Sequence, residues 1–215
     1  YSSFFYPLFF VIVIPFPFPD ALFNCRHPGF MYRGDMDSNI LPVELEKAYR
    51  LVTHGPTVLV SAAHGGVVDV MAAAWCCALD FAPPKVTVVL DKITRTRELV
   101  EQSGRFVIQV PNLAQLALVN GVGNSSLHDN LDKLQQHGVE LFSAGDKNLP
   151  LVAGCSAWLA CDLVSEPHNQ QSYDLFIGEV TAAWADQRIF RNGHWLFEQA
   201  DERWKSLHHV AGGHY

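Results

Sequence analysis

Runs of apolar and β-branched residues, broken by glycine, proline and polar turns, recur along the chain from residue 41 onward. This pattern predicts strands rather than long helices. The predicted strands cover residues 56–63, 67–80, 85–91, 105–111, 151–166, 173–186 and 188–197. The last run contains Asn192-Gly193, a dipeptide typical of a two-residue hairpin turn. The sequence therefore predicts about seven strands.

Short helices are predicted between these strands, each with a recognisable start or stop signal. Residues 41–55 have proline in the first turn and end at a glycine, and residues 94–104 begin at Thr94, a good N-cap, and end at Gly104. Two further helices are predicted at residues 112–121 and 129–138, and residues 167–172 are expected to form a polar loop. The links are short, and the strands do not alternate with long helices, which disfavours a doubly wound parallel sheet. A closed or nearly closed antiparallel barrel is favoured, because closure removes exposed strand edges.

The first thirty residues differ from the rest of the chain. They are almost entirely aromatic, aliphatic and proline, and they lack the basic start of a signal peptide. Pro15, Pro17 and Pro19 interrupt the apolar run, so it does not read as a membrane helix. We expect residues 1–30 to lie outside the domain, as translated upstream sequence with Met31 or Met36 as the natural start. The alternative is an extended arm laid along a neighbour. The domain is expected at residues 31–215.

Composition limits the classes of function. The chain has 215 residues, 49% of them hydrophobic, and a net charge of −7, so it can bury one sizeable core. The acidic balance argues against non-specific binding of nucleic acid or of an anionic membrane. Five cysteines, with no Cys-x-x-Cys pair, fit a reducing compartment, which we take to be the cytoplasm.

The adjacent cysteines Cys76 and Cys77 invite a redox or metal interpretation, which their surroundings do not favour. Neighbouring Cα atoms lie about 3.8 Å apart, below the usual minimum of about 4.4 Å for a disulfide. No other cysteine or histidine lies within eight residues of the pair, so a metal site is not predicted. In a continuous strand, alternation places only small residues on one face: Ala72, Ala74, Cys76 and Ala78. We interpret the cysteines as small core residues beside a flat ligand or another backbone.

A cluster of cations and hydroxyl groups marks the start of the predicted helix at residue 94. Lys92, Thr94, Arg95, Thr96 and Arg97 gather where free backbone N–H groups and the helix dipole favour an anion. Phosphate is the anion that such a site typically binds. On these residues alone, the alternative is a solvated basic turn offset by neighbouring carboxylates. The histidines form no metal or catalytic set, and no nucleophile elbow or P-loop is present.

Several of these stretches together resemble the flavin reductase-like, FMN-binding split-barrel family. The resemblance begins with GPTVLVSA and continues through DVMAAAWCCALDFAPPKVTVVLDKITRTRELVEQSGRFVIQVP. The DKL of residues 132–134, the cysteine of AWLACDLVSE, YDLFIGEVTAA and the terminal HHVAGGHY follow in the family's order. The resemblance covers residues 41–215.

The resemblance implies a mainly β (α+β) fold: a six-stranded antiparallel Greek-key split barrel with short peripheral helices. It also implies a homodimer that binds FMN near the subunit interface. The flavin phosphate would lie at Lys92, Thr94, Arg95 and Thr96, and the flavin ring would lie along the segment that carries Asp69, Met71, Ala72, Ala73, Trp75 and Cys76. Many members of the family have asparagine where this chain has Asp69, and often histidine where it has Tyr173.

The implied activity is transfer of a hydride from NAD(P)H to FMN, with electrons passed to a partner oxygenase or another acceptor. The hydride chemistry belongs to the cofactor, so we predict no catalytic side-chain acid or base and no metal. One alternative is an FMN-bearing electron carrier without NAD(P)H activity. Another is a barrel that has lost its flavin and serves in assembly, which the retained basic cluster disfavours.

Overall fold

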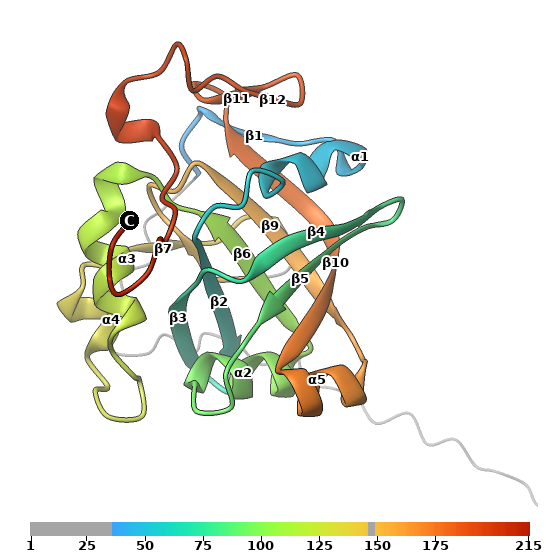
Figure 1. Ribbon diagram of the computed structural model, residues 1–215, viewed down its shortest axis with the longest axis vertical. Helices are drawn as coiled ribbons and strands as arrows, with labels where there is room; N and C mark the ends of the chain where they lie inside the picture. The colour runs from blue at the N-terminus through green and yellow to red at the C-terminus, as the bar shows by residue number, and fades with distance from the viewer. Residues whose placement is uncertain (1–35, 146–148) are drawn as a thin grey trace, which may run out of the picture.

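The computed structural model describes residues 36–145 and 149–215, and its main feature is one antiparallel sheet of eight strands (Figure 1). The strands follow the order β3-β2-β6-β9-β10-β5-β4, and β1 pairs with the far end of β10. The strands of this sheet are β1 (Ile40–Pro42), β2 (Val58–His64), β3 (Val67–Ala73), β4 (Cys76–Phe81), β5 (Pro84–Val89), β6 (Arg105–Val110), β9 (Ala157–Val164) and β10 (Leu175–Asp186).

The remaining elements are short and lie around the sheet. Two small hairpins pair β7 (Leu141–Phe142) with β8 (Leu151–Val152), and β11 (Phe190–Arg191) with β12 (His194–Trp195). The α-helices are α1 (Leu45–Ala48), α2 (Arg95–Ser103), α3 (Leu116–Gly123), α4 (Lys133–Gln136) and α5 (Pro167–Tyr173). The 3₁₀ turns are η1 (Tyr49–Leu51), η2 (Leu113–Gln115) and η3 (Glu202–Trp204).

The sheet curls into a barrel that stays open along one seam. Strands β3 and β4 are the two ends of the hydrogen-bonded path, and no ladder joins them within residues 36–145 and 149–215. The predicted antiparallel split barrel is therefore confirmed, with eight strands in the sheet rather than six. The long strand β10 connects its parts, because it pairs with β9 along most of its length, with β5 at its start and with β1 at its end.

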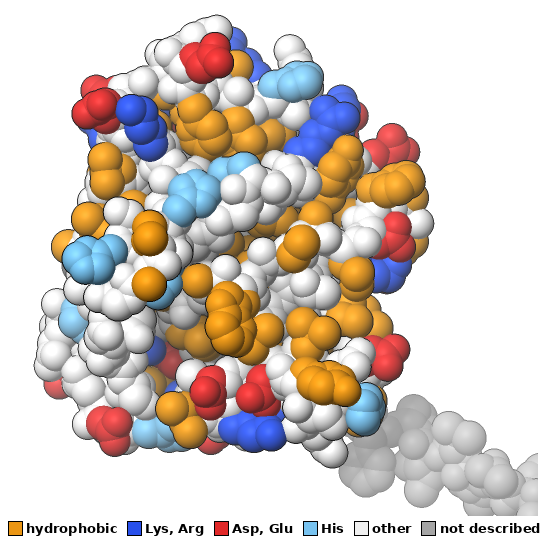
Figure 2. Space-filling model, in the orientation of Figure 1, with side chains coloured by type: hydrophobic (Ala, Val, Ile, Leu, Met, Phe, Trp, Pro, Cys, Tyr) orange, Lys and Arg blue, Asp and Glu red, His pale blue; other side chains and the backbone are white. Residues whose placement is uncertain are grey.

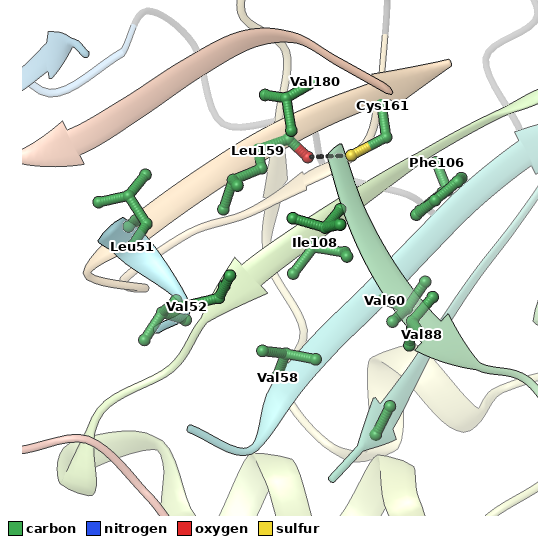
Figure 3. Close-up of a cluster of buried hydrophobic side chains, with 14 of the residues drawn as sticks. Leu51, Val52, Val58, Val60, Val88, Phe106, Ile108, Leu159, Cys161 and Val180 are labelled. Atoms are coloured by element: carbon green, nitrogen blue, oxygen red, sulfur yellow. Dashed lines mark hydrogen bonds between the residues drawn. The ribbon is translucent and has the colours of Figure 1, made fainter. Parts of the chain in front are cut away.

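Two apolar clusters, one on each side of the sheet, stabilise this barrel. The inner cluster fills the barrel with alternate residues of its strands, including Val60, Phe106 and Ile108, as Figure 3 shows. Strand β10 contributes Gly178 at a point where a Cβ atom would lie 2.5 Å from the ring of Phe106. The outer cluster lies between the opposite face of the sheet and helices α3 and α4, and it includes Trp158.

The prediction of a single strand at residues 67–80 is wrong, because two strands, β3 and β4, form there. The chain breaks at Ala74 and Trp75, because it leaves one edge of the seam and begins the other. The break also changes the phase of alternation: Cys76 packs against the inner cluster together with Met71 and Ala73, whereas Ala72 packs against the outer cluster. The predicted face of small residues is therefore split between the two sides of the sheet.

The helix predictions were partly correct. Thr94 occupies the N-cap position of α2, and Gly104 ends that helix with a left-handed φ of 67°, as expected. The helix expected at residues 129–138 is reduced to α4, which covers Lys133–Gln136. The loop expected at residues 167–172 is wrong, since α5 forms there with proline in its first turn.

No helix in residues 36–145 and 149–215 is long and apolar enough to cross a bilayer. The interpretation of residues 1–30 as a segment outside the domain concerns a part of the chain that lies outside the described residues.

Candidate functional site

The start of α2 is an uncapped helix N-terminus at the base of the barrel (Figure 1). Thr94 has extended backbone angles, and its hydroxyl donates to the Asp91 carbonyl oxygen at 2.8 Å instead of accepting from the helix. The first N–H groups of an α-helix have no acceptor within the helix, and the helix dipole makes this end positive. The first turn of α2 therefore presents backbone donors suited to an anion.

Two of the predicted cations flank this helix start, and each is held by a contact that is exposed for Lys92 and half-buried for Arg95. Lys92, whose side chain is 59% exposed, donates from Nζ to the Gln171 carbonyl oxygen at 2.7 Å. Arg95 pairs with Glu98 one turn further along the helix. Figure 2 shows basic and acidic side chains side by side at this lower end of the molecule. An exposed contact contributes little to stability, so Lys92 can turn to a bound anion at small cost. Arg95 is 28% exposed, and it would have to release Glu98 to do the same.

Arg97, the third basic residue of the cluster, has a structural role instead. Its side chain is 7% exposed and lies 2.5 Å from Asp174, and its guanidinium also donates to Glu101 and to the Gln170 carbonyl oxygen. The hydrogen bond from Arg97 holds the pKa of the Asp174 carboxyl below its usual range. Arg97 thus fastens α5 to α2, and it does not add to the charge presented at the helix start.

The Thr96 hydroxyl points into the protein. It donates to Asp69 Oδ2 at 2.7 Å, and the other oxygen of that carboxylate lies 2.9 Å from Nζ of Lys133. The side chains of Asp69 and Lys133 are each 2% exposed, so this is a buried ion pair between β3 and α4. With the Thr94 hydroxyl bound to Asp91, both hydroxyl protons at the start of α2 are directed to protein acceptors.

The residues predicted to lie along the flavin ring flank the open seam, but they do not share one surface. Asp69 is committed to the buried ion pair, and Ala72 contacts α3 near Gly123. Trp75, in the break between the two strands, is 75% exposed. Burial, reinforced by the neighbouring thiol of Cys77, raises the pKa of Cys76 to about 12, so this thiol is protonated and is no nucleophile.

Sequence reasoning missed the role of Lys133. The residue stands in the DKL stretch, but its partner Asp69 lies 64 positions away on β3. A lysine that follows an aspartate gives no local sign of burial. Only the packing of α4 against the barrel reveals the contact.

The open antiparallel barrel, with the uncapped start of α2 beside the edge strand β3, has the architecture of a split barrel. The chain belongs to the flavin reductase like domain family, whose sequence model matches residues 49–201. It is similar to the solved FMN-binding domain of a flavin reductase-like enzyme from Shewanella baltica OS155. That likeness has 63% sequence identity and a TM-score of 0.81, covering 83% of this chain and 94% of the other.

Two further relatives extend the comparison. The uncharacterized protein YddH of Escherichia coli K12 is 40% identical over 179 residues, which are 82% of this chain and 93% of YddH. Flavoredoxin of Desulfovibrio vulgaris (Miyazaki F) has a TM-score of 0.57 at 25% identity, covering 66% of this chain and 75% of flavoredoxin.

Proposed function

We propose that this protein binds FMN and transfers a hydride to it from NAD(P)H, with the electrons passing to a downstream acceptor such as a partner oxygenase. The observation that carries the proposal is the uncapped start of α2 between Lys92 and Arg95, at the base of a split barrel. The similarity to an FMN-binding domain at 63% identity supports the choice of flavin. Five cysteines, an odd number with no Cys-x-x-Cys pair, fit a protein of the reducing cytoplasm.

In this proposal the first-turn N–H groups of α2, with Lys92 and Arg95, bind the FMN phosphate. Thr94 and Thr96 contribute backbone groups, because their hydroxyl protons are bound elsewhere. The segment that includes Met71 lines the flavin ring with apolar side chains and main-chain groups. Bound FMN supplies the hydride acceptor, and the protein orients the two rings and excludes water.

Binding of FMN is tested with purified protein freed of flavin, by the change in FMN fluorescence on titration. Lys92→Ala and Arg95→Ala are each expected to weaken binding about tenfold, since each removes one charge-assisted contact to phosphate. Arg105→Ala is the matched control, because Arg105 follows the opposite end of α2 and is 47% exposed. The proposal is wrong if wild-type protein takes up no FMN, or if all three variants bind it as the wild type does.

Hydride transfer is tested by anaerobic titration of the FMN-loaded protein with NADH and with NADPH. Bleaching of the flavin absorbance within seconds by either donor supports a reductase. The second candidate function, an electron carrier, is favoured by the similarity to flavoredoxin. If dithionite bleaches the flavin but neither NADH nor NADPH does, the protein belongs to that class.

We also propose that the protein is a homodimer that buries the outer face of β4. Leu79 is 53% exposed and Phe81 is 65% exposed, and both lie on a strand at the edge of the sheet. Exposed apolar side chains of this kind on an edge strand are typical of an interface. Phe81→Glu is expected to give a monomer in light scattering after size exclusion, whereas Leu131→Glu, at an 86% exposed position on another surface, should not. A monomeric wild type would contradict this proposal.

A further inference from the structure

We propose that Asp69 and Thr96 are positioning residues for phosphate binding, and that Lys133 is the cation that pairs with the Asp69 carboxylate in this buried site. This inference rests on the proposed binding of FMN. It assigns a role to a buried charged cluster that joins three elements far apart in the sequence. These elements are strand β3, the first turn of α2, and helix α4.

The two oxygens of Asp69 have separate partners. Oδ2 accepts from the Thr96 hydroxyl at 2.7 Å, and Oδ1 accepts from Lys133 Nζ at 2.9 Å. Thr96 is fully buried, and the other two side chains are 2% exposed, so water competes for neither hydrogen bond. A buried carboxylate that accepts from a charged donor holds its partners in a short, well-directed geometry.

Thr96 lies in the first turn of α2, where its own backbone N–H is one of the donors available to an anion. Its side chain therefore ties the helix start to β3, the strand at one edge of the seam. Together with the buried Leu99 and Val100, this bond fixes the rotation of α2 about its axis, and with it the direction of the first-turn N–H groups. Because the hydroxyl faces inward, Thr96 orients the phosphate site without donating its own proton to the phosphate.

Lys133 explains why a carboxylate is tolerated at this position. An isolated buried charge is costly, and pairing with hydrogen-bonded neighbours is what permits it. The pair leaves the cluster without net charge. It therefore adds no repulsion against a phosphate bound at the start of α2.

The test compares FMN with riboflavin, which has the same ring system and lacks the phosphate. Thr96→Val removes the hydroxyl at nearly constant volume, and Thr96→Ser retains it. The Asp69→Leu/Lys133→Met pair of substitutions removes both charges and the acceptor for Thr96. The matched Asp69→Asn/Lys133→Met pair also removes both charges, but it keeps an oxygen that Thr96 can reach.

We expect Thr96→Val and Asp69→Leu/Lys133→Met to weaken FMN binding about tenfold, the fold-change that corresponds to the loss of one hydrogen bond. Riboflavin binding should be unchanged in both. Thr96→Ser and Asp69→Asn/Lys133→Met should bind FMN within about threefold of the wild type. Thermal unfolding of each flavin-free variant confirms that the protein is folded at the assay temperature, and the two Thr96 variants suffice if a double variant does not fold.

Three results would overturn the inference while leaving the proposed function intact: equal losses for FMN and riboflavin, no loss for either, or tighter FMN binding in Asp69→Leu/Lys133→Met. The last would show that the freed Thr96 hydroxyl donates to the phosphate directly. Wild-type protein that binds neither flavin would instead overturn the proposed function, and this inference with it.

Discussion

Lys133→Met is expected to lower the free energy of unfolding by about 3–5 kcal/mol, the cost of leaving one partner of a buried ion pair alone. Lys133 and Asp69 are each 2% exposed and their charged atoms lie 2.9 Å apart, so the pair is both buried and close. Methionine fills most of the volume of the lysine stem, so loss of packing adds little. Since a domain of this kind is stable by about 5–15 kcal/mol, the loss should be plain in a urea titration.

Two controls separate the electrostatic cost from the loss of a lysine as such. Lys205 pairs with Glu202 at 3.2 Å, but the two side chains are 54% and 83% exposed, so Lys205→Met should cost under about 0.5 kcal/mol. Asp69→Asn added to Lys133→Met should recover most of the loss, because no charge is then buried alone. The reasoning is refuted if Lys133→Met costs no more than Lys205→Met, or if the added Asp69→Asn recovers nothing.

Three further predictions address the core, the pH dependence and α5. Gly178→Ala should destabilise by about 1–3 kcal/mol, because its Cβ would overlap the Phe106 ring, and Phe106→Leu in the same chain should recover part of the loss in urea unfolding. Burial, followed by the nearby imidazole of His208, lowers the pKa of His54 from 6.5 to about 4, so the fold favours neutral His54. The resulting stability is complete above about pH 6.5 and is lost as the pH falls towards 4; His54→Phe should flatten this dependence, and an unchanged slope would contradict it. Asp174→Asn keeps a residue that tolerates the left-handed φ of 54°, but it weakens the bond to Arg97. Because α5 has no buried residues, amide hydrogen exchange should then rise in α5 and not in α2.

The sequence was informative wherever structure is local. Runs of β-branched residues predicted β2, β5, β6 and β10, and Thr94 and Gly104 marked the bounds of α2. The resemblance to a family added the arrangement of these strands, which no periodicity contains. Family membership and fold class are both confirmed by the comparisons.

The errors arose where tertiary structure overrides the local pattern. The run through Ala74 and Trp75 is as apolar as a strand, yet the chain must leave the sheet there to start its other edge. Helix α5 buries none of its residues, so it has no hydrophobic periodicity, although Pro167 was a usable start signal. The contact between Asp69 and Lys133 is a property of packing, and a single sequence does not encode it in any spacing.

The open seam bears on how this protein can diverge. Strand edges present N–H and C=O groups that are the same for every residue except proline. Binding of a ligand through such backbone groups does not depend on side-chain identity. A chain such as YddH, which shares 40% of aligned positions, can therefore make the same backbone contacts with different side chains. Proline is not tolerated at such an edge, because it has no backbone N–H to donate. We therefore expect β3 and β4 to accept many side-chain substitutions during evolution and to exclude proline.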